Sequence, residues 1–482
     1  MKKYIMKKLS LFFAITLAFL SLSCEDSIEG INTDPLAATN ISPELLFPQV
    51  LLGGITANRT VETFQMSTHS QQWSFSAPFG VFINPERGTI SPNSTNNVWV
   101  GNYTTGLRNL QQIRLLTERN NPEALNIIGQ AKVLEAFIYL NLTQIFGDVP
   151  FSQAIQVDEF PNPEFDTQEE VLRGIPELVD EAVDALSSPT DIIGAPADLV
   201  YEGNRENWIR FANSIKLKAL MLVANVDPTS VQAQLQEVST QPLITSNQFE
   251  AKLDYLDVAG NQNPIYTLVL QFAGGSQDFY SGGSTLVDLM NSNNDPRRAA
   301  YFDDVNGSYV GQPQGSFVLD RNQFSQISSD IIVPELPDRY ITASEVNFYL
   351  AEAALEGWIS GNANEFYRAG ISASLGQYDG MPNAVPQADK DEYLSSPRGT
   401  ITGDSQDVAL RKIFEEHYVS DFMRHLESWT TIRRNGVPDY QPIQGTVLPD
   451  NIKRYQIPLS EITSNPNAPE VTPLVEPMWF EN

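Results

Sequence analysis

Cys24 has the most specific chemistry in this sequence, because it is the only cysteine among 482 residues. Four early lysines and an apolar run from Leu9 to Leu22 precede it. A basic start, a short apolar stretch and small residues before a cut site are typical of an export signal. The run is also shorter than the roughly 18 residues that indicate a membrane-spanning helix. We therefore expect a signal peptide over residues 1–23 and a tether over 24–40 whose Cys24 thiol accepts a lipid.

The segment from His69 to Phe82 is rich in aromatic and amide side chains and is the best candidate for ligand recognition. Sugars present C–H faces and hydroxyl rims, which flat rings and polar side chains can match. Pro78, Gly80 and the lack of helical periodicity place the segment on a loop, where functional residues concentrate. The predicted ligand contacts are Gln71, Gln72, Trp73, Phe75 and Phe79. The alternative is that these aromatic residues fill the scaffold beneath the loop.

A second loop, from Phe272 to Gly283, contains four glycines and adds Asp278 and Tyr280 as candidate ligand contacts. Its glycines allow tight turns near a ligand, but they also suit a plain surface loop. Trp99 opens a helical segment and either lines the floor of the same site or packs internally. Three further tryptophans fall on helical stripes and are expected in the core: Trp208, Trp358 and Trp429.

No residue set indicates catalysis. The 59 carboxylates form pairs at any chosen spacing by chance, so they single out no acid and base of a glycoside hydrolase. On one helix, His417 and His425 would lie about 12 Å apart, too far to share a zinc ion. The motifs of zinc proteases, serine hydrolases and nucleotide-binding loops are absent from the sequence. We predict no catalytic residue, no metal ion and no cofactor.

These candidate residues need a scaffold, and the strongest regular signal is helical. Apolar residues recur at helical spacing in four pairs of segments, near residues 97–146, 167–225, 342–375 and 406–434. Capping boxes are predicted at Thr167 with Glu170 and at Thr342 with Glu345, and Gly147 suits a helix end. Repeated helix pairs that cannot bury their faces alone are typical of a tetratricopeptide (TPR) solenoid.

The predicted fold is therefore all-α, a TPR-like scaffold of four helix pairs with long loop insertions near 66–96 and 240–340. No linker divides it, so residues 41–482 are expected to form one domain. Within the segment from Glu206 to Asn225, Lys216 and Lys218 lie off the apolar stripe, and a bend is plausible near Ser420.

The charge balance excludes several partners. The chain carries 30 Lys and Arg against 59 Asp and Glu, a formal net charge of −29. Nucleic acids and anionic lipid surfaces both need a basic footprint, which such a chain does not offer. Membrane attachment would then depend on lipid chains, and several on one cysteine hold better than one.

Seven groups of segments, in order along nearly the whole chain, resemble the SusD/RagB family of outer-membrane lipoproteins. They are Asn32–Pro35 with Ser42–Leu46, Phe146–Phe151, Trp208–Leu217, Asn294–Arg297, Ser344–Ala354, Glu427–Trp429 with Arg433 and Arg434, and Arg454–Glu461 with Asn465–Asn467.

The resemblance implies a four-TPR scaffold whose insertions capture a glycan or oligosaccharide at the cell surface. In that family the lipoprotein closes over a SusC-like TonB-dependent transporter and delivers its ligand to it. Glu25 and Asp26 after the cysteine are similar to the acidic tag of surface-exposed members. A peptide ligand is the alternative within the family, a secreted helical glycoside hydrolase is a more distant one, and a TPR adaptor that binds only proteins is a third.

Overall fold

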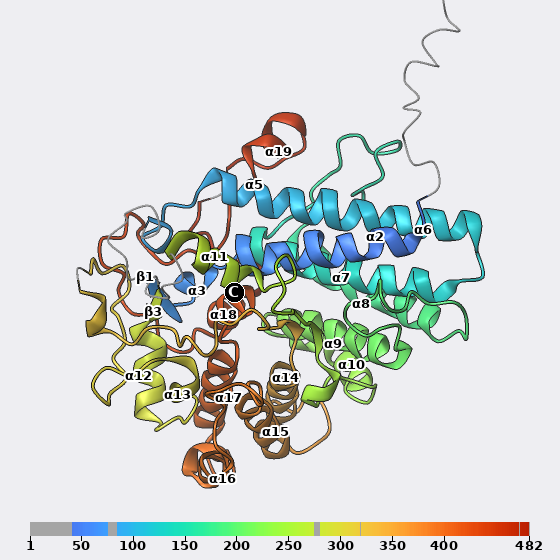
Figure 1. The fold of residues 1–482 in the computed structure, drawn as a ribbon. Coiled ribbons are helices and arrows are strands. Elements are labelled where there is room, and N and C mark those ends of the chain that lie inside the picture. Colours follow the sequence, from blue (N-terminus) through green and yellow to red (C-terminus); the bar gives the residue numbers. More distant parts are fainter. Residues whose placement is uncertain (1–40, 76–83, 274–279, 319, 472, 482) are drawn as a thin grey trace, which may run out of the picture. The chain divides into compact units, whose positions relative to one another are not determined.

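Helices dominate the part of the chain that the computed structural model describes, which is residues 41–75, 84–273, 280–318, 320–471 and 473–481 (Figure 1). The α-helices are α2 Pro43–Gln49, α3 Met66–His69, α5 Pro92–Val100, α6 Arg108–Asn120, α7 Leu125–Phe146, α8 Gln168–Leu186, α9 Arg205–Ala224, α10 Pro228–Val238, α11 Pro264–Ala273, α12 Ser284–Ser292, α13 Arg298–Tyr301, α14 Ala343–Leu355, α15 Ala363–Leu375, α16 Gln387–Ser395, α17 Gln406–Ser420, α18 His425–Asn435 and α19 Leu459–Ser464. The strands are β1 Trp73–Phe75, β2 Ala251–Leu253, β3 Tyr280–Gly282 and β4 Asp338–Ile341.

The four predicted helix pairs are present. They are α5 and α6 with α7, then α8 with α9, α14 with α15, and α17 with α18. Along the chain α7 packs on α6 and α8, and α8 packs on α9, while α14 contacts both α9 and α17. Figure 1 shows α6 to α9 layered in sequence order, with α12 and α13 on the other side of α17. The prediction of an all-α, TPR-like scaffold is confirmed.

Local end signals explain several helix boundaries. The Thr167 hydroxyl accepts from the Glu170 N–H, and the Glu170 carboxylate accepts from the Thr167 N–H, which completes the predicted capping box. Gly147 ends α7 at a φ of 83°, a conformation that favours glycine. Thr342 also caps its helix, but Glu345 does not return the bond. The second predicted capping box is therefore only half right, because Glu345 binds buried cations instead.

The first predicted helix is not uniform. A π-helix, Gly101–Leu107, joins α5 to α6, and two more, Val50–Thr56 and Asn58–Glu62, follow α2. The π-helices Val50–Thr56 and Gly101–Leu107 pack on each other through glycines, since a Cβ on Gly54 would lie 2.7 Å from Gly106 Cα. Glycine spacing therefore sets how closely these two segments approach.

Helix α9 is enclosed by its neighbours, so even its lysines are buried. Lys216 and Lys218 lie off the apolar stripe, yet they are 2% and 1% exposed. Lys216 Nζ reaches Asp180 Oδ1 at 2.6 Å. Lys218 Nζ reaches Glu345 Oε1 at 2.8 Å, and that carboxylate belongs to α14. The side of the helix off the apolar stripe thus carries an ion pair with the partly exposed Asp180 and an interior ion pair with Glu345.

Lys218 belongs to a central charge cluster that joins distant segments. Its members are Arg59, Lys218, Asp338, Glu345, Asp421, Arg424 and Glu427, all buried. Arg59 Nη1 lies 2.8 Å from Glu427 Oε1, and Arg424 Nη2 lies 2.6 Å from Glu345 Oε2. Arg424 and Lys218 lower the pKa of Glu345 to about 2, against the effect of burial, which raises it. Removing one partner of such a cluster leaves an uncompensated buried charge.

A second cluster of buried charges ties α17 to two other segments. Arg297 Nη2 contacts both Asp295 Oδ2 at 2.5 Å and Glu416 Oε2 at 2.6 Å. Arg398 Nε lies 2.7 Å from Glu416 Oε1. The charged residues of the predicted family motifs near 294–297, 344–354 and 427–429 therefore serve the interior of the scaffold.

Residues 43–482 form one compact unit. The predicted signal peptide and the whole of the predicted tether fall on residues 1–40, outside the described residues. In the described part of the chain, no helix is long and apolar enough to cross a membrane.

Candidate functional site

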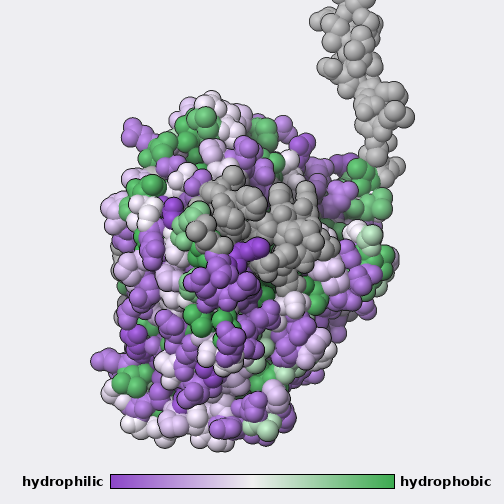
Figure 2. Space-filling view, turned by 60° about the vertical axis from the view of Figure 1, so that its left-hand side comes forward, coloured by the Kyte–Doolittle hydropathy of each residue, from purple (hydrophilic) through white to green (hydrophobic). Residues whose placement is uncertain are grey.

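The two loops predicted to bind ligand meet in the structure, although about 200 residues separate them. Strands β1 and β3 pair antiparallel, with Trp73 opposite Gly282, Ser74 opposite Ser281 and Phe75 opposite Tyr280. We call this pair the ribbon. The face of the molecule turned forward in Figure 2 is mostly hydrophilic where it is coloured.

The aromatic residues of the ribbon are packed inward. Trp73 and Phe75 are each 1% exposed and Tyr280 is 8% exposed, and all three belong to the hydrophobic core. The rings of Trp73 and Tyr280 lie 5.0 Å apart, and those of Phe75 and Tyr280 lie 5.6 Å apart. This burial favours the alternative that these rings fill the scaffold beneath a loop.

Gln71 and Gln72 connect the ribbon to the C-terminal part of the chain. The Gln71 side chain donates to Gln441 O at 2.8 Å and accepts from the Gln441 N–H at 2.8 Å. Gln72 Nε2 donates to Tyr418 O on α17. Gln71 has a φ of 61°, which is uncommon for a residue other than glycine. Both glutamines are fully buried, so their visible role is to hold the chain in place.

Phe79, Asp278 and Cys24 lie outside the described residues. Their predicted roles in ligand binding and lipidation stay predictions.

Glu86 is a buried carboxyl beneath the ribbon that the sequence reasoning missed. Its Oε1 accepts from the Ser74 hydroxyl at 2.7 Å and from the Gly315 N–H at 2.6 Å, and its Oε2 accepts from the Phe75 N–H at 3.0 Å. Burial raises the pKa of Glu86 to about 7, against the lowering effect of these hydrogen bonds. The carboxyl thereby connects β1 to the segment around Gly315.

A hollow of about 300 Å³ lies beside the ribbon, in the segment that Gln71 holds. Its lining residues are Tyr440, Gln441, Pro442, Ile443, Thr446, Leu448, Pro449, Asp450 and Asn451. The Tyr440 hydroxyl is buried and has no hydrogen-bond partner within the described part of the chain. We call this the ribbon-side hollow. No sequence signal pointed to it, because its residues form an irregular loop with neither a period nor a motif.

Trp99 lies apart from the ribbon, so the structure does not bring it to the other predicted contacts. Its ring is 5% exposed, stacks on Phe165 at 6.1 Å, and lines a hollow of about 310 Å³ with Tyr103 and Glu461. The Tyr103 hydroxyl donates to Pro150 O at 2.7 Å.

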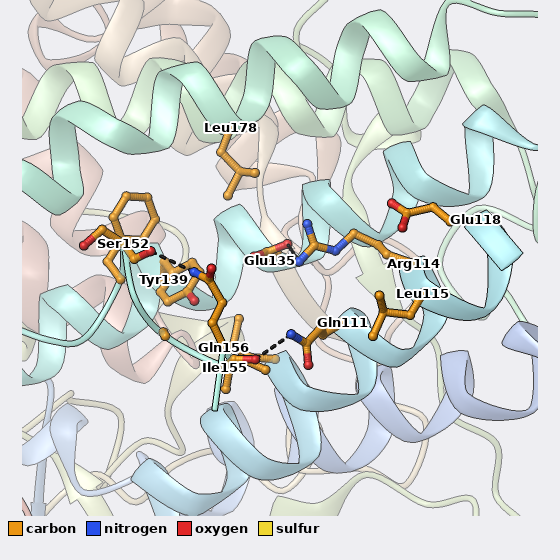
Figure 3. A pocket seen from close by; sticks show the side chains of 13 residues that line it. Gln111, Arg114, Leu115, Glu118, Glu135, Tyr139, Ser152, Ile155, Gln156 and Leu178 are labelled. Carbon is orange, nitrogen blue, oxygen red and sulfur yellow. Dashed lines mark hydrogen bonds and ion pairs between the residues drawn. The ribbon is translucent and has the colours of Figure 1, made fainter. Parts of the chain in front are cut away.

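Another hollow, of about 480 Å³, lies between α6, α7, α8 and the loop that follows α7 (Figure 3). Both this hollow and the one at Trp99 are lined by Ala154 and Ile155, so the loop from Pro150 to Val157 separates them. We call the larger one the helix-side hollow. Arg114 and Glu135, on its wall and floor, were not singled out from the sequence, since isolated charges on helices are usually solvated.

The three histidines show no arrangement that suits a metal ion or general base. His417 lies in the last turn of α17 and His425 begins α18, so the expectation that both lie on one helix is wrong, while the bend predicted near Ser420 is present. Burial lowers the pKa of His69, His417 and His425 to about 3, so each is neutral at pH 7. Within the described residues, no group of His, Cys, Asp and Glu could hold a metal ion.

The fold and these hollows define a class: a helical, TPR-like scaffold whose insertions fold together on one side and leave concave surfaces beside them. The family model described as starch-binding associating with outer membrane, SusD-like, matches residues 35–458. The chain therefore belongs to the SusD-like family, and the resemblance drawn from its motifs is confirmed.

Solved structures agree with this fold. A chitin-binding protein superposes with a TM-score of 0.78 at 24% identity, covering 92% of this chain and 100% of its own. A SusD homologue from Bacteroides fragilis gives 0.75 at 24% identity, with the same coverage of both chains. A chitin-binding SusD homologue from Flavobacterium johnsoniae gives 0.75 at 20% identity, covering 91% and 97%. No curated protein matches the sequence significantly.

Proposed function

We propose that this protein captures a glycan or oligosaccharide at the cell surface and passes it to a SusC-like TonB-dependent transporter. One observation carries the proposal: the family model described as starch-binding associating with outer membrane covers residues 35–458, nearly the whole chain after the leader. The protein acts in this proposal as a binder and not as an enzyme. It holds its ligand by shape and hydrogen bonds and leaves the glycosidic bonds intact.

We place the principal site where the insertions meet, over the ribbon and the ribbon-side hollow. Trp73, Phe75 and Tyr280 fix the ribbon, while Gln71 and Gln72 fix the segment that lines the hollow. The Tyr440 hydroxyl there has no hydrogen-bond partner among the described residues, and an unpaired buried hydroxyl costs free energy until a group bonds to it. Phe79 and Asp278, which lie outside the described residues, remain predicted contacts, as does Trp99 in its separate hollow.

A glycan is favoured over a peptide as the ligand. Two of the similar structures are of chitin-binding proteins. A peptide held by strand addition would need an open strand edge, whereas the ribbon is already bridged at Ser281 to Gln326 and at Gly283 to Gln312. The peptide-binding alternative is tested beside the glycan.

The anchor in this proposal is the lipid on Cys24. With a formal net charge of −29, the chain has no basic surface for anionic lipids, so attachment depends on the acyl chains. The transporter partner follows from the family and would receive the ligand from the face that carries the insertions.

Calorimetric titration with chito-oligosaccharides, malto-oligosaccharides and a mixed peptide library tests the proposal. We expect saturable binding of one glycan class and no new product after prolonged incubation. Saturable binding of peptides alone would overturn the glycan assignment. Turnover that is lost on changing one carboxylate, with binding kept, would overturn the assignment as a binder.

A matched pair of tyrosine variants tests the placement. Tyr440→Phe removes a hydroxyl that has no partner in the described part of the chain, so it should weaken glycan binding by about 1 kcal/mol and leave stability unchanged. Tyr201→Phe removes a hydroxyl that donates to Phe249 O at 3.0 Å, so it should lower stability and leave affinity unchanged. Unchanged affinity in Tyr440→Phe would move the principal site away from the ribbon-side hollow.

A further inference from the structure

The helix-side hollow is lined by the helices of the scaffold and the loop after α7, and not by the two predicted ligand-binding insertions. Helix α7 contributes Glu135 and Tyr139, while α6 contributes Gln111 and Arg114 and α8 contributes Leu178 (Figure 3). Its volume of about 480 Å³ falls in the roughly 300–1,000 Å³ range of small-molecule sites.

One end of the hollow is closed by a loop that is held in a strained shape. Ile155 has a φ of 59°, which is a genuine outlier for a β-branched residue. Gln111 Nε2 donates to Ile155 O, and Gln156 Nε2 donates to Ser152 O at 2.9 Å (Figure 3). Such strain persists only where surrounding contacts impose it, and here both amide groups fix the loop from inside the hollow.

The charged pair within the hollow is incompletely satisfied. Arg114 Nη2 lies 3.4 Å from Glu135 Oε2, longer than the roughly 2.7–2.9 Å of a well-made charged hydrogen bond. Arg114 Nε and Glu135 Oε2 are both buried without a hydrogen-bond partner in the described chain. The two side chains nevertheless remain 27% and 15% exposed, so part of each opens into the hollow. Burial raises the pKa of Glu135, and Arg114 only partly offsets this.

The chemistry of the pair selects the kind of ligand. An ammonium or guanidinium group only donates hydrogen bonds, so it would meet the Arg114 charge and leave that side chain unsatisfied. A carboxylate or phosphate only accepts, and it would meet the charges of Glu135 and Glu118. A hydroxyl group both accepts and donates, so one hydroxyl or two neighbouring ones can bond to the parts of both side chains that open into the hollow. The apolar part of the wall, with Leu178 and Phe151, offers a surface for C–H groups.

We propose that the helix-side hollow is a second carbohydrate site, distinct from the site at the ribbon, which takes one uncharged sugar ring of a bound glycan. The class of ligand rests on the proposed function, whereas the hydroxyl argument rests on Arg114 and Glu135 alone. A second site would let one protein hold two glycan chains, or two parts of one long chain, before transfer.

Calorimetric titration with N-acetylchito-oligosaccharides and malto-oligosaccharides, in the wild-type protein and in three variants, tests this site. Arg114→Met removes the donor, and Leu115→Trp places a ring at the mouth from a residue that is 42% exposed and outside the buried pair. Arg119→Met, an exposed arginine on the same helix, is the control. We expect two bound sugars per protein in the wild type and in the control. In Arg114→Met and Leu115→Trp we expect either one bound sugar or at least a tenfold loss of affinity at the second site.

The outcomes separate this inference from the proposed function. If no probe binds the wild-type protein, both are overturned. If a probe binds with the same stoichiometry and affinity in all four proteins, the second site is overturned while the principal site stands. If Arg114→Met fails to fold, as circular dichroism would show, Leu115→Trp decides alone, because its substitution leaves the buried pair in place.

Discussion

Trp73→Ala should lower the free energy of unfolding by about 3 kcal/mol. The indole is 1% exposed and lies against the rings of Tyr280, Phe422 and His425 at 5.0, 6.5 and 5.1 Å. A buried tryptophan covers roughly 150–250 Å², worth about 5 kcal/mol at ~25 cal/mol per Å². The indole N–H is buried without a partner in the described chain, so its removal offsets about 2 kcal/mol of the lost stability. The difference gives the expected loss.

Two other variants calibrate this number. Trp208 is also fully buried, but its Nε1 donates to Asp198 Oδ2 at 2.7 Å. Trp208→Ala therefore loses a charge-assisted bond as well as the ring, and should cost about 5 kcal/mol or more. Trp73→Phe keeps most of the buried area and removes the unsatisfied N–H, so it should cost less than about 1.5 kcal/mol.

Urea unfolding of the three variants, followed with glycan titration of each folded protein, measures both quantities. The expected order of stability is wild type, Trp73→Phe, Trp73→Ala and Trp208→Ala. A Trp73→Ala protein with the wild-type unfolding midpoint and lost affinity would refute this reasoning. It would mean that the ring serves the ligand and that the packed arrangement gives way when ligand binds.

Three further outcomes follow from other residues. Cys24→Ala should fold but no longer take up a labelled fatty acid or remain with the outer membrane, and label persisting on the variant would contradict the anchor. Glu86 keeps its proton in the folded state up to a pH of about 7 but loses it near pH 4.5 in the unfolded state. Its contribution to stability should therefore fall by roughly 3 kcal/mol as the pH rises from about 4.5 to about 7. Melting from pH 5 to pH 8 should therefore show a wild-type advantage over Glu86→Gln that shrinks with pH, and a constant difference would contradict the raised pKa. Lys218→Met should cost about 3–5 kcal/mol because it leaves Glu345 and Glu427 short of a cation, whereas Lys218→Met combined with Glu345→Gln should cost less than the sum of the two single changes.

The scaffold could be predicted from sequence because its signals are local. Helix α8 shows this most clearly, since Thr167 and Glu170 are three residues apart and form both bonds of the capping box. Gly147 likewise ends α7 where its position suggested. Both signals depend on neighbours within one helical turn, so a single sequence carries them.

The ribbon could not be predicted, because its partners are far apart and its strands are three residues long. A segment such as Trp73–Phe75 is too short for alternation to show, and nothing in it identifies Tyr280–Gly282 as its partner. The inward orientation of Trp73 depends on Phe422 and His425, which no local pattern relates to it. The prediction of an irregular loop from residue 69 to 82 therefore missed both the strand at Trp73–Phe75 and the burial of its side chains.

Glu345 shows a different kind of error. Its spacing from Thr342 suits a capping box, but Lys218 and Arg424 compete for the same carboxylate and are buried beside it. The interior ion pairs outweigh a bond to the Thr342 N–H, because a buried cation without a partner costs several kcal/mol.

The central charge cluster also governs when this chain can collapse. Arg59 pairs with Asp338 and Glu427, which lie 279 and 368 positions further along the sequence. At roughly 5–20 residues per second, a ribosome that has made Arg59 needs about 20–70 s more to make its last partner. Throughout that interval, burying Arg59 or Lys218 would place an uncompensated cation in the interior, so the early helices gain little by closing over them. The cluster therefore disfavours burial of the early helices until the last of its partners has been made. A polypeptide that must cross a membrane before it folds needs to stay open in this way.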